Sequence, residues 1–324
     1  MRSRSFRSLA LAVLGASVAL AAGQNKAMDS KVTAQEIAEA LKQPTCVIKM
    51  DHTIDVRDLP HDLPRFPDWM KGLRDDLPIS MVSIPATHDA GTALGRTGGT
   101  WCQSLTIPAQ LELGIRGLDI RLCLVGNEFH IYHGDEYQKV TFDQVMSTLR
   151  SFLHAHPHEF FVMRVKEEHP PQHPTTSFLA AFEEIFRSKR YGSLFYHATS
   201  RTEIPTVAQM RGKILVMDNY GKMPDVIDYA NPTMTIQDDY DTSDMEHKYT
   251  EIVANFEGAL SNTDASKWFM NYTSSYTTQV SQLANAKAIN PRVVEYLRGK
   301  HGHLGLVLMN FPGPGMIRQI LESN

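Results

Sequence analysis

The stretch SIPATHDAGTALGRTGG, residues 83–99, decides which fold the chain is expected to adopt. An apolar run, residues 79–84, leads into it and breaks at Pro85, and His88 and Asp89 follow within a few residues. Small residues surround this pair, so a ligand has room to approach the imidazole ring. An apolar run of strand length that ends in His-Asp predicts a chemically active loop at the end of a β-strand.

Seven further apolar runs of strand length follow this loop. Amphipathic stretches, with apolar residues at positions i, i+3 and i+4, lie between several of them and predict helices. The strand candidates are 79–84, 115–122, 128–132, 160–165, 213–218, 233–237, 267–272 and 304–310, and the helix candidates are 141–156, 177–189, 243–260 and 280–299. This alternation favours an α/β chain with a parallel sheet.

About eight strands in roughly 250 residues suit a single, irregular (β/α) TIM-type barrel, in which the active site lies where the strands end. A doubly wound open sheet is the alternative, but no G-x-G-x-x-G motif follows the first strand candidate. We therefore expect an α/β fold built as one TIM-type barrel with an N-terminal leader.

The N-terminal region divides into two segments before the barrel. Residues 1–23 combine a basic start, an apolar core and small residues at 19–21, which is typical of a cleaved secretory signal peptide. Residues 24–67 form a leader with one helix candidate, 33–42, and residues 68–324 form the barrel. The sequence therefore predicts a secreted protein.

The composition limits the possible partners. The 324-residue chain has a net charge of −4, which argues against a nucleic-acid partner because such a partner requires a basic surface. We expect a monomer. Cys46, Cys102 and Cys123 can form at most one disulfide within the chain, and the sequence does not select the pair.

Polar side chains gather at or just beyond the ends of the strand candidates. Two histidines, an arginine and a lysine among carboxylates suit acid–base chemistry on an anionic substrate, such as cleavage of a phosphodiester. The residues are His88, Asp89, Asp119, Arg121, His133, Lys166, Glu167, Asp218, Asn219, Asp238, Tyr240, Asn271, Tyr272 and Asn310.

Several of these positions have a plainer interpretation. Strand alternation sends His130 and His133 to opposite faces, and His133, which precedes a glycine, is the better candidate for the site. Asp119 and Arg121 share a face and could form a purely structural ion pair. The histidines of residues 154–158 fall between a helix and the next strand, at the end of the barrel away from the site, so we predict no metal site there.

Three motifs together resemble one enzyme family. SIPATHDAGT, GIRGLDIRL and YHGDEY follow in the order and spacing of the phosphatidylinositol-specific phospholipase C family. The resemblance is to the X-domain barrel of its secreted, bacterial-type, metal-independent members. It extends from about residue 69 to the C-terminal helix, and MRVKEE, RGKILVMDNY, TIQDDY, FMNYTS and LGLVLMNF support it.

This resemblance implies a lyase or phosphodiesterase that cleaves phosphatidylinositol, or glycosyl-phosphatidylinositol (GPI) anchors, at a membrane surface. His88 would be the general base for the inositol 2-hydroxyl, and His133 the general acid for the departing diacylglycerol, supported by Asp89. The first product would be inositol 1,2-cyclic phosphate. Arg121 stands where calcium-dependent members carry acidic ligands, so no metal and no calcium is expected.

The resemblance also assigns positions around the substrate, and two residues depart from the family pattern. Lys166, Asp238 and Tyr240 match positions that contact the inositol ring, and Asp119 would hold Arg121 beside the substrate. Asn219 stands where some relatives have a basic residue. Asn310 replaces the aspartate that usually orients the base histidine, so it joins the expected catalytic set with an amide in place of a carboxylate.

Two other functions remain open from the sequence. Asn310 motivates a catalytically weak, inositol-phosphate-binding pseudoenzyme, whereas a glycerophosphodiester phosphodiesterase would need an acidic metal cluster where Arg121 lies. Trp101 could be a membrane anchor at the rim of the site or a packed core residue. The sequon at Asn271 is a weak indication of glycosylation.

Overall fold

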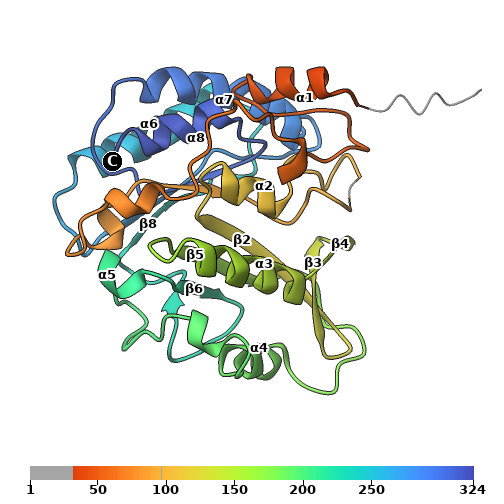
Figure 1. Ribbon diagram of the computed structural model, residues 1–324, viewed down its shortest axis with the longest axis vertical. Helices are drawn as coiled ribbons and strands as arrows, with labels where there is room; N and C mark the ends of the chain where they lie inside the picture. The colour runs from red at the N-terminus through yellow and green to blue at the C-terminus, as the bar shows by residue number, and fades with distance from the viewer. Residues whose placement is uncertain (1–31, 96) are drawn as a thin grey trace, which may run out of the picture. The chain divides into compact units, whose positions relative to one another are not determined.

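The computed structural model describes residues 32–95 and 97–324 (Figure 1). Residues 32–324 form one compact unit. The expected signal peptide, residues 1–23, and the first part of the leader, residues 24–31, lie outside the described residues. In the part of the chain that the structure describes, no helix has both the length and the apolar character needed to cross a membrane.

A curved sheet of ten strands forms the centre of this unit (Figure 1). Eight strands lie parallel in the order β7-β6-β5-β2-β1-β10-β9-β8, and an antiparallel hairpin, β3 and β4, extends from β2. The strands are β1 (Ile84–Thr87), β2 (Gly117–Val125), β3 (Glu128–His133), β4 (Glu136–Thr141), β5 (Phe161–Glu167), β6 (Ile214–Asn219), β7 (Ile227–Asp228), β8 (Met234–Gln237), β9 (Trp268–Tyr272) and β10 (Leu306–Met309). Within the described ranges no pairing joins β7 to β8, so the barrel stays open there. The expected irregular TIM-type fold is confirmed.

Helices surround the curved sheet (Figure 1). They are α1 (Ala34–Leu41), α2 (Ile107–Glu112), α3 (Phe142–Ala155), α4 (Phe178–Phe186), α5 (Val207–Met210), α6 (Met245–Ser261), α7 (Gln282–Leu297) and α8 (Pro314–Leu321). Polar side chains fix where the long ones begin: Thr141 and Gln144 form a capping box at α3, and Asp244 and Ser281 cap α6 and α7. The amphipathic patterns predicted α1, α3, α4, α6 and α7 to within a few residues, whereas α2, α5 and α8 were not among the helix candidates.

The strand that leads into the site begins later than the apolar run suggested. Residues 79–81 form a 3₁₀ turn, and β1 starts only at Ile84 and runs through Pro85 to Thr87. Pro85 has no N–H to donate to the sheet, but its carbonyl accepts the Arg116 N–H at 2.9 Å. The hairpin strand β4 escaped prediction because its sequence is mostly polar, and β7 because it has only two residues.

Part of the leader belongs to the same core. Ile37, Leu41, Ile54 and Leu59 are buried in the main apolar cluster. The Cys46 N–H donates to the carbonyl of Phe311 at 2.9 Å, which ties this segment to the loop after β10. From residue 32 onward the leader is therefore ordered, which the sequence did not decide.

The structure decides whether the cysteines form a disulfide and whether Asn271 can carry a glycan. Cys46, Cys102 and Cys123 are all buried free thiols, so the chain has no disulfide. Asn271 is fully buried, and its amide binds the Ile252 carbonyl and the Gln237 side chain. The sequon is therefore part of the core and offers no glycan site.

A buried ion pair joins several elements at the N-terminal ends of the strands. Arg116 Nε donates to Glu159 Oε2 at 2.8 Å, and both side chains are fully buried. The guanidinium also donates to the carbonyls of Leu111 and Pro67, while Glu159 accepts the N–H of Met70. The pair thus connects the end of the leader to β2 and to the turn before β5.

Replacing Glu159 by alanine should lower the free energy of unfolding by about 3–5 kcal/mol, because Arg116 would be left buried and unpaired. Urea denaturation checks this. Glu183→Ala is the matched control, since Glu183 pairs with Arg187 at 2.9 Å on the exposed surface, where an ion pair stabilises by about 1 kcal/mol or less. Equal effects of the two substitutions would contradict the structural importance of the buried pair.

Candidate active site

A cavity of about 410 Å³ opens at the C-terminal ends of the strands, where parallel barrels place their active sites. Seven of the nine predicted site residues line it, and Asp89 and Asp119 lie directly behind them. The lining residues are His88, Gly99, Arg121, His133, Arg164, Lys166, Asp238, Tyr240, Ser274, Ser275, Tyr276, Gln282 and Asn310.

His88, directly after β1, presents one ring nitrogen to the cavity and fixes the other. Its Nε2 lies 2.6 Å from Arg121 Nη2, and its Nδ1 lies 2.9 Å from Asn310 Oδ1. A guanidinium can only donate, so Nε2 accepts and the ring hydrogen is on Nδ1, which donates to Asn310. Burial lowers the pKa of His88. The ring is therefore neutral, with the lone pair of Nε2 available as a base.

Arg121, on β2, is held by carboxylates from three segments. Its Nε lies 2.8 Å from Asp89 Oδ1 and 3.1 Å from Asp119 Oδ2, and its Nη1 lies 3.5 Å from Glu168 Oε1. Burial opposes the charge, but Asp119 and Asp89 outweigh it and raise the pKa of Arg121 further. The result is a permanent cation whose planar donors face the cavity.

Asp89 connects the two histidines. Its Oδ2 lies 3.3 Å from His88 Nε2 and 3.7 Å from His133 Nε2. Burial alone would raise the pKa of Asp89, but the charges of Arg121 and the histidines outweigh it and lower that pKa, so the carboxylate is ionised. The residue adopts φ 47°, a left-handed conformation that is costly outside glycine, so the loop holds Asp89 in place against some backbone strain.

His133, at the end of β3, faces the same space from the opposite side. Its Nδ1 lies 3.0 Å from the carbonyl of Thr100, which accepts the ring hydrogen and leaves Nε2 directed toward Asp89. His130 lines no part of this cavity, as the alternation of the strand indicated, and its ring instead packs at a tilt of 48° against Tyr137, with the centroids 4.9 Å apart.

Asp119 orients the guanidinium groups of Arg121 and Arg164 and does not itself face the cavity. It is fully buried and is absent from the cavity lining. Its Oδ2 accepts from Arg121 and from the N–H of Asp89, while its Oδ1 accepts from Arg164 Nη1 at 3.1 Å. The predicted contact with Arg121 is present, and it serves to position the guanidinium groups.

Arg164 is the main cavity residue that the sequence reasoning missed. Its guanidinium donates to Asn219 Oδ1 at 2.6 and 3.2 Å and lies over the ring of Tyr229, 4.4 Å from the centroid. Asn219, where some relatives carry a basic residue, thus holds an arginine from the neighbouring strand. The alternation of β5 was the available signal, because Arg164 and Lys166 share a face.

The acidic partner in this region also differs from the expected one. Lys166 Nζ donates to Glu168 Oε2 at 2.6 Å, so Glu168, and not Glu167, contacts the cations of the site. The loop after β8 supplies Asp238, whose pKa is raised by burial, and Tyr240, which is 65% exposed. This loop is anchored from behind by the buried ammonium of Lys248, which donates to the carbonyl of Asp239.

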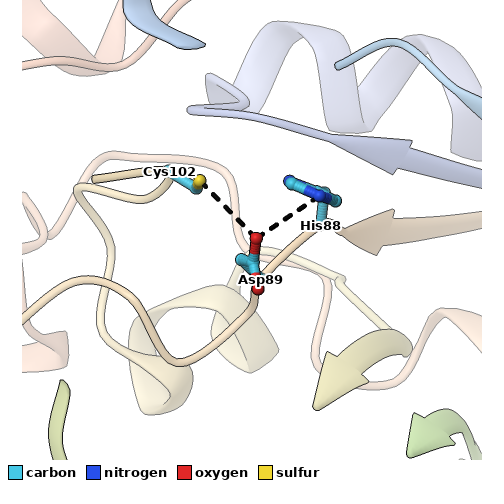
Figure 2. Close-up of side chains that lie close together, drawn as sticks. All are labelled: His88, Asp89 and Cys102. Atoms are coloured by element: carbon cyan, nitrogen blue, oxygen red, sulfur yellow. Dashed lines mark hydrogen bonds and ion pairs between the residues drawn. The ribbon is translucent and has the colours of Figure 1, made fainter. Parts of the chain in front are cut away.

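Two residues of the loop after β1 have clear positions. Trp101 is buried, donates to the carbonyl of Gln103 and packs against Phe311, so the core interpretation holds and the rim-anchor interpretation is wrong. Cys102, which the sequence did not single out, places its Sγ 3.8 Å from Asp89 Oδ2. Figure 2 shows Asp89 between His88 and Cys102.

Comparison with known proteins agrees with this geometry. Residues 76–220 match the model of the phosphatidylinositol-specific phospholipase C, X domain, family. The chain is 32% identical over 280 residues to a 1-phosphatidylinositol phosphodiesterase of Listeria monocytogenes, covering 79% of this chain and 84% of that protein. It is 26% identical over 300 residues to the protein of that name from Staphylococcus aureus strain Newman, covering 79% and 94%.

A solved structure shows the same arrangement of elements. The phosphatidylinositol-specific phospholipase C from Listeria monocytogenes superimposes with a TM-score of 0.70 at 30% identity, over 80% of this chain and 98% of that one. The resemblance inferred from the three motifs is thus confirmed by comparison of sequences and of folds. The chain belongs to the phosphatidylinositol-specific phospholipase C family.

Proposed function

We propose that this protein cleaves phosphatidylinositol, or the phosphatidylinositol part of GPI anchors, at a membrane surface. The observation that carries the proposal is the placement of His88 and His133 on two sides of the Asp89–Arg121 pair. Such a site can take a proton on one side of a phosphodiester and give a proton on the other.

In the first step two protons are transferred, one phosphorus–oxygen bond forms and another breaks. Nε2 of His88 takes the proton of the inositol 2-hydroxyl, whose oxygen attacks the phosphorus, while the bond from phosphorus to the diacylglycerol oxygen breaks. His133 gives a proton to that oxygen, and Asp89, whose Oδ2 lies 3.7 Å from His133 Nε2, positions the ring for this transfer. Arg121 leaves Nε2 of His88 and donates to the phosphate oxygens as their charge grows.

The products are diacylglycerol and inositol 1,2-cyclic phosphate. Water can then open the cyclic phosphate with the histidines in exchanged roles, His133 as base and His88 as acid. Lys166, Asp238 and Tyr240 contact the inositol ring in this proposal, and Arg164 adds a further set of donors. Asp119 orients both guanidinium groups.

The surroundings of the cavity suit a lipid interface. Tyr240 and Tyr276 line the cavity and are 65% and 44% exposed, and tyrosine favours the boundary between lipid and water.

The basic and apolar pattern of residues 1–23 supports secretion, and we include secretion as a monomer in the proposal. Arg121 supplies positive charge at the phosphate, so the proposed reaction needs no metal cofactor.

His88→Ala and His133→Ala should each reduce turnover of phosphatidylinositol in mixed vesicles by about 10²–10⁴-fold, because general base or general acid catalysis is lost. Phosphorus NMR distinguishes the cyclic product from inositol 1-phosphate. His130→Ala is the matched control, since this ring lies outside the cavity, and it should retain turnover. Wild-type protein that binds inositol phosphate without any turnover would instead favour the pseudoenzyme alternative.

Turnover should persist in excess EDTA, with calcium adding little, because Arg121 occupies the region where a calcium ion would act. Initial rates with EDTA alone and with added calcium measure this. Circular dichroism of the same samples separates a loss of folding from a loss of catalysis. Activity that strictly requires calcium would contradict the role given to Arg121.

Asn310→Asp should raise turnover. The amide accepts the Nδ1 hydrogen of His88 but cannot stabilise the imidazolium that forms during catalysis, and the Asn310 Nδ2 is buried without a hydrogen-bond partner among the described residues. A carboxylate removes that unsatisfied donor and favours the charged ring, which raises the pKa of His88.

The pH profile provides the matching readout for Asn310→Asp. Since the base must be neutral to act, a higher pKa of His88 moves the acidic limb of the kcat/KM profile toward higher pH. Asn310→Ala serves as the control and should lower turnover, because no group then orients the ring. Lower turnover in Asn310→Asp would show that another carboxylate already stabilises the charged His88.

A further inference from the structure

Cys102 adds a thiol to the group of side chains around Asp89. Among the residues that the structure describes, His88, Asp89 and Cys102 are the one group of three or more His, Cys, Asp or Glu whose ligand atoms converge, all within 4.8 Å of one another. Figure 2 shows the two dashed contacts from Asp89, one to His88 and one to Cys102. All three side chains are largely or fully buried.

The spacing around Asp89 Oδ2 matches a tetrahedral zinc site. Zinc binds nitrogen and oxygen at about 2.0–2.2 Å and sulfur at about 2.3 Å, so its ligand atoms lie roughly 3.3–3.6 Å apart. From Asp89 Oδ2, the distance is 3.3 Å to His88 Nε2, 3.7 Å to His133 Nε2 and 3.8 Å to Cys102 Sγ. His133 is not part of the converging group, so zinc would take His88 Nε2, Asp89 Oδ2 and Cys102 Sγ as its protein ligands and leave the fourth position to water.

The outer contacts of both histidines are those of metal ligands. His88 directs its Nδ1 hydrogen to Asn310 Oδ1 and His133 directs its own to the carbonyl of Thr100, at 2.9 and 3.0 Å. Hydrogen bonds of this kind fix the tautomer and the orientation of metal-binding imidazoles. The Nε2 lone pair of His88 is therefore aimed at Asp89 Oδ2 and its surroundings before any ion arrives, while His133 lies beside this group.

The charge of Arg121 does not close the site to a cation. Asp89, Asp119 and Glu168 surround the guanidinium at 2.8–3.5 Å, so its charge is well compensated. Asp89 contacts Arg121 through Oδ1, which leaves Oδ2 for the ion. The Nη2 group must leave His88 Nε2, which is the same movement that the proposed reaction requires.

We infer that this chain has a zinc-binding inhibitory site formed by His88, Asp89 and Cys102. Zinc displaces the thiol proton of Cys102 to solvent and binds the thiolate together with the His88 imidazole and the Asp89 carboxylate, with water as the fourth ligand. Bound zinc occupies the Nε2 lone pair of His88 and the carboxylate of Asp89, which catalysis needs, so turnover stops. The thiolate distinguishes this site from one made of the histidines alone.

Cobalt and zinc binding to the untagged, full-length protein tests this inference without any substrate, so its failure is separate from failure of the proposed reaction. Cobalt should bind one ion per chain and produce a thiolate-to-cobalt charge-transfer band. Cys102→Ala should lose the band and weaken zinc binding, measured by competition with an indicator, at least ~10-fold.

Cys123→Ala is the matched control. Its Sγ also lies near a histidine, 3.7 Å from His169 Nδ1, but outside the converging group, so the band and the zinc affinity should be retained. In turnover assays, zinc should inhibit the wild type reversibly to EDTA, and Cys102→Ala should need at least ~10-fold more zinc relative to its own zinc-free rate.

The inference is overturned if saturating cobalt gives no thiolate band in the wild type, a measurement that needs no variant. It is also overturned if Cys102→Ala keeps the band or the zinc affinity, or if Cys123→Ala loses them. Cys102→Ser, which preserves the size of the side chain, replaces the alanine variant if the latter does not fold.

Discussion

The contact of the Arg121 guanidinium with Asp89 and Asp119 is the interaction on which the rest of the site depends. Both carboxylates are buried, and a buried charge without a partner is strongly destabilising. The contact requires β1 and β2 to lie close together. Gly117 permits this, since a Cβ there would lie only 2.4 Å from the Cβ of Ala86. The loop after β1 and the charged face of β2 are thereby brought to one place.

From this contact the electrostatic character of the site follows. Arg121 keeps Asp89 ionised and, together with burial, keeps His88 neutral. A neutral ring needs only an acceptor for its Nδ1 hydrogen, and the amide of Asn310 is sufficient for that in the resting protein. The cost of the amide arises when the ring becomes charged, so Asn310 affects the reaction more than the fold.

Much of this arrangement could be predicted from the sequence, because strand periodicity and strand-end polar residues report directly on a barrel. His88, His133 and Arg121 were found in this way and with the help of the family resemblance. Arg164 was overlooked because an arginine inside an apolar run looks structural until its partners are known. Cys102 and Trp101 lie in an irregular loop, where no periodicity indicates which side chains face inward. The packing of the leader depends on contacts with residues about 250 positions away, which local patterns do not encode.

The Tyr276 N–H donates to the Tyr240 carbonyl at 2.8 Å, which joins the loop after β9 to the loop after β8. Each loop thereby offers an exposed tyrosine at the rim, and the same two segments supply Asp238, Ser274 and Ser275 to the cavity wall. On the proposed function, adsorption to a bilayer and occupation of the cavity are then linked equilibria. If binding to the bilayer raises the affinity for the inositol headgroup by some factor, binding of the headgroup raises the affinity for the bilayer by the same factor. On the proposed function, the same two hydrogen-bonded loops therefore bind both the substrate and the membrane surface.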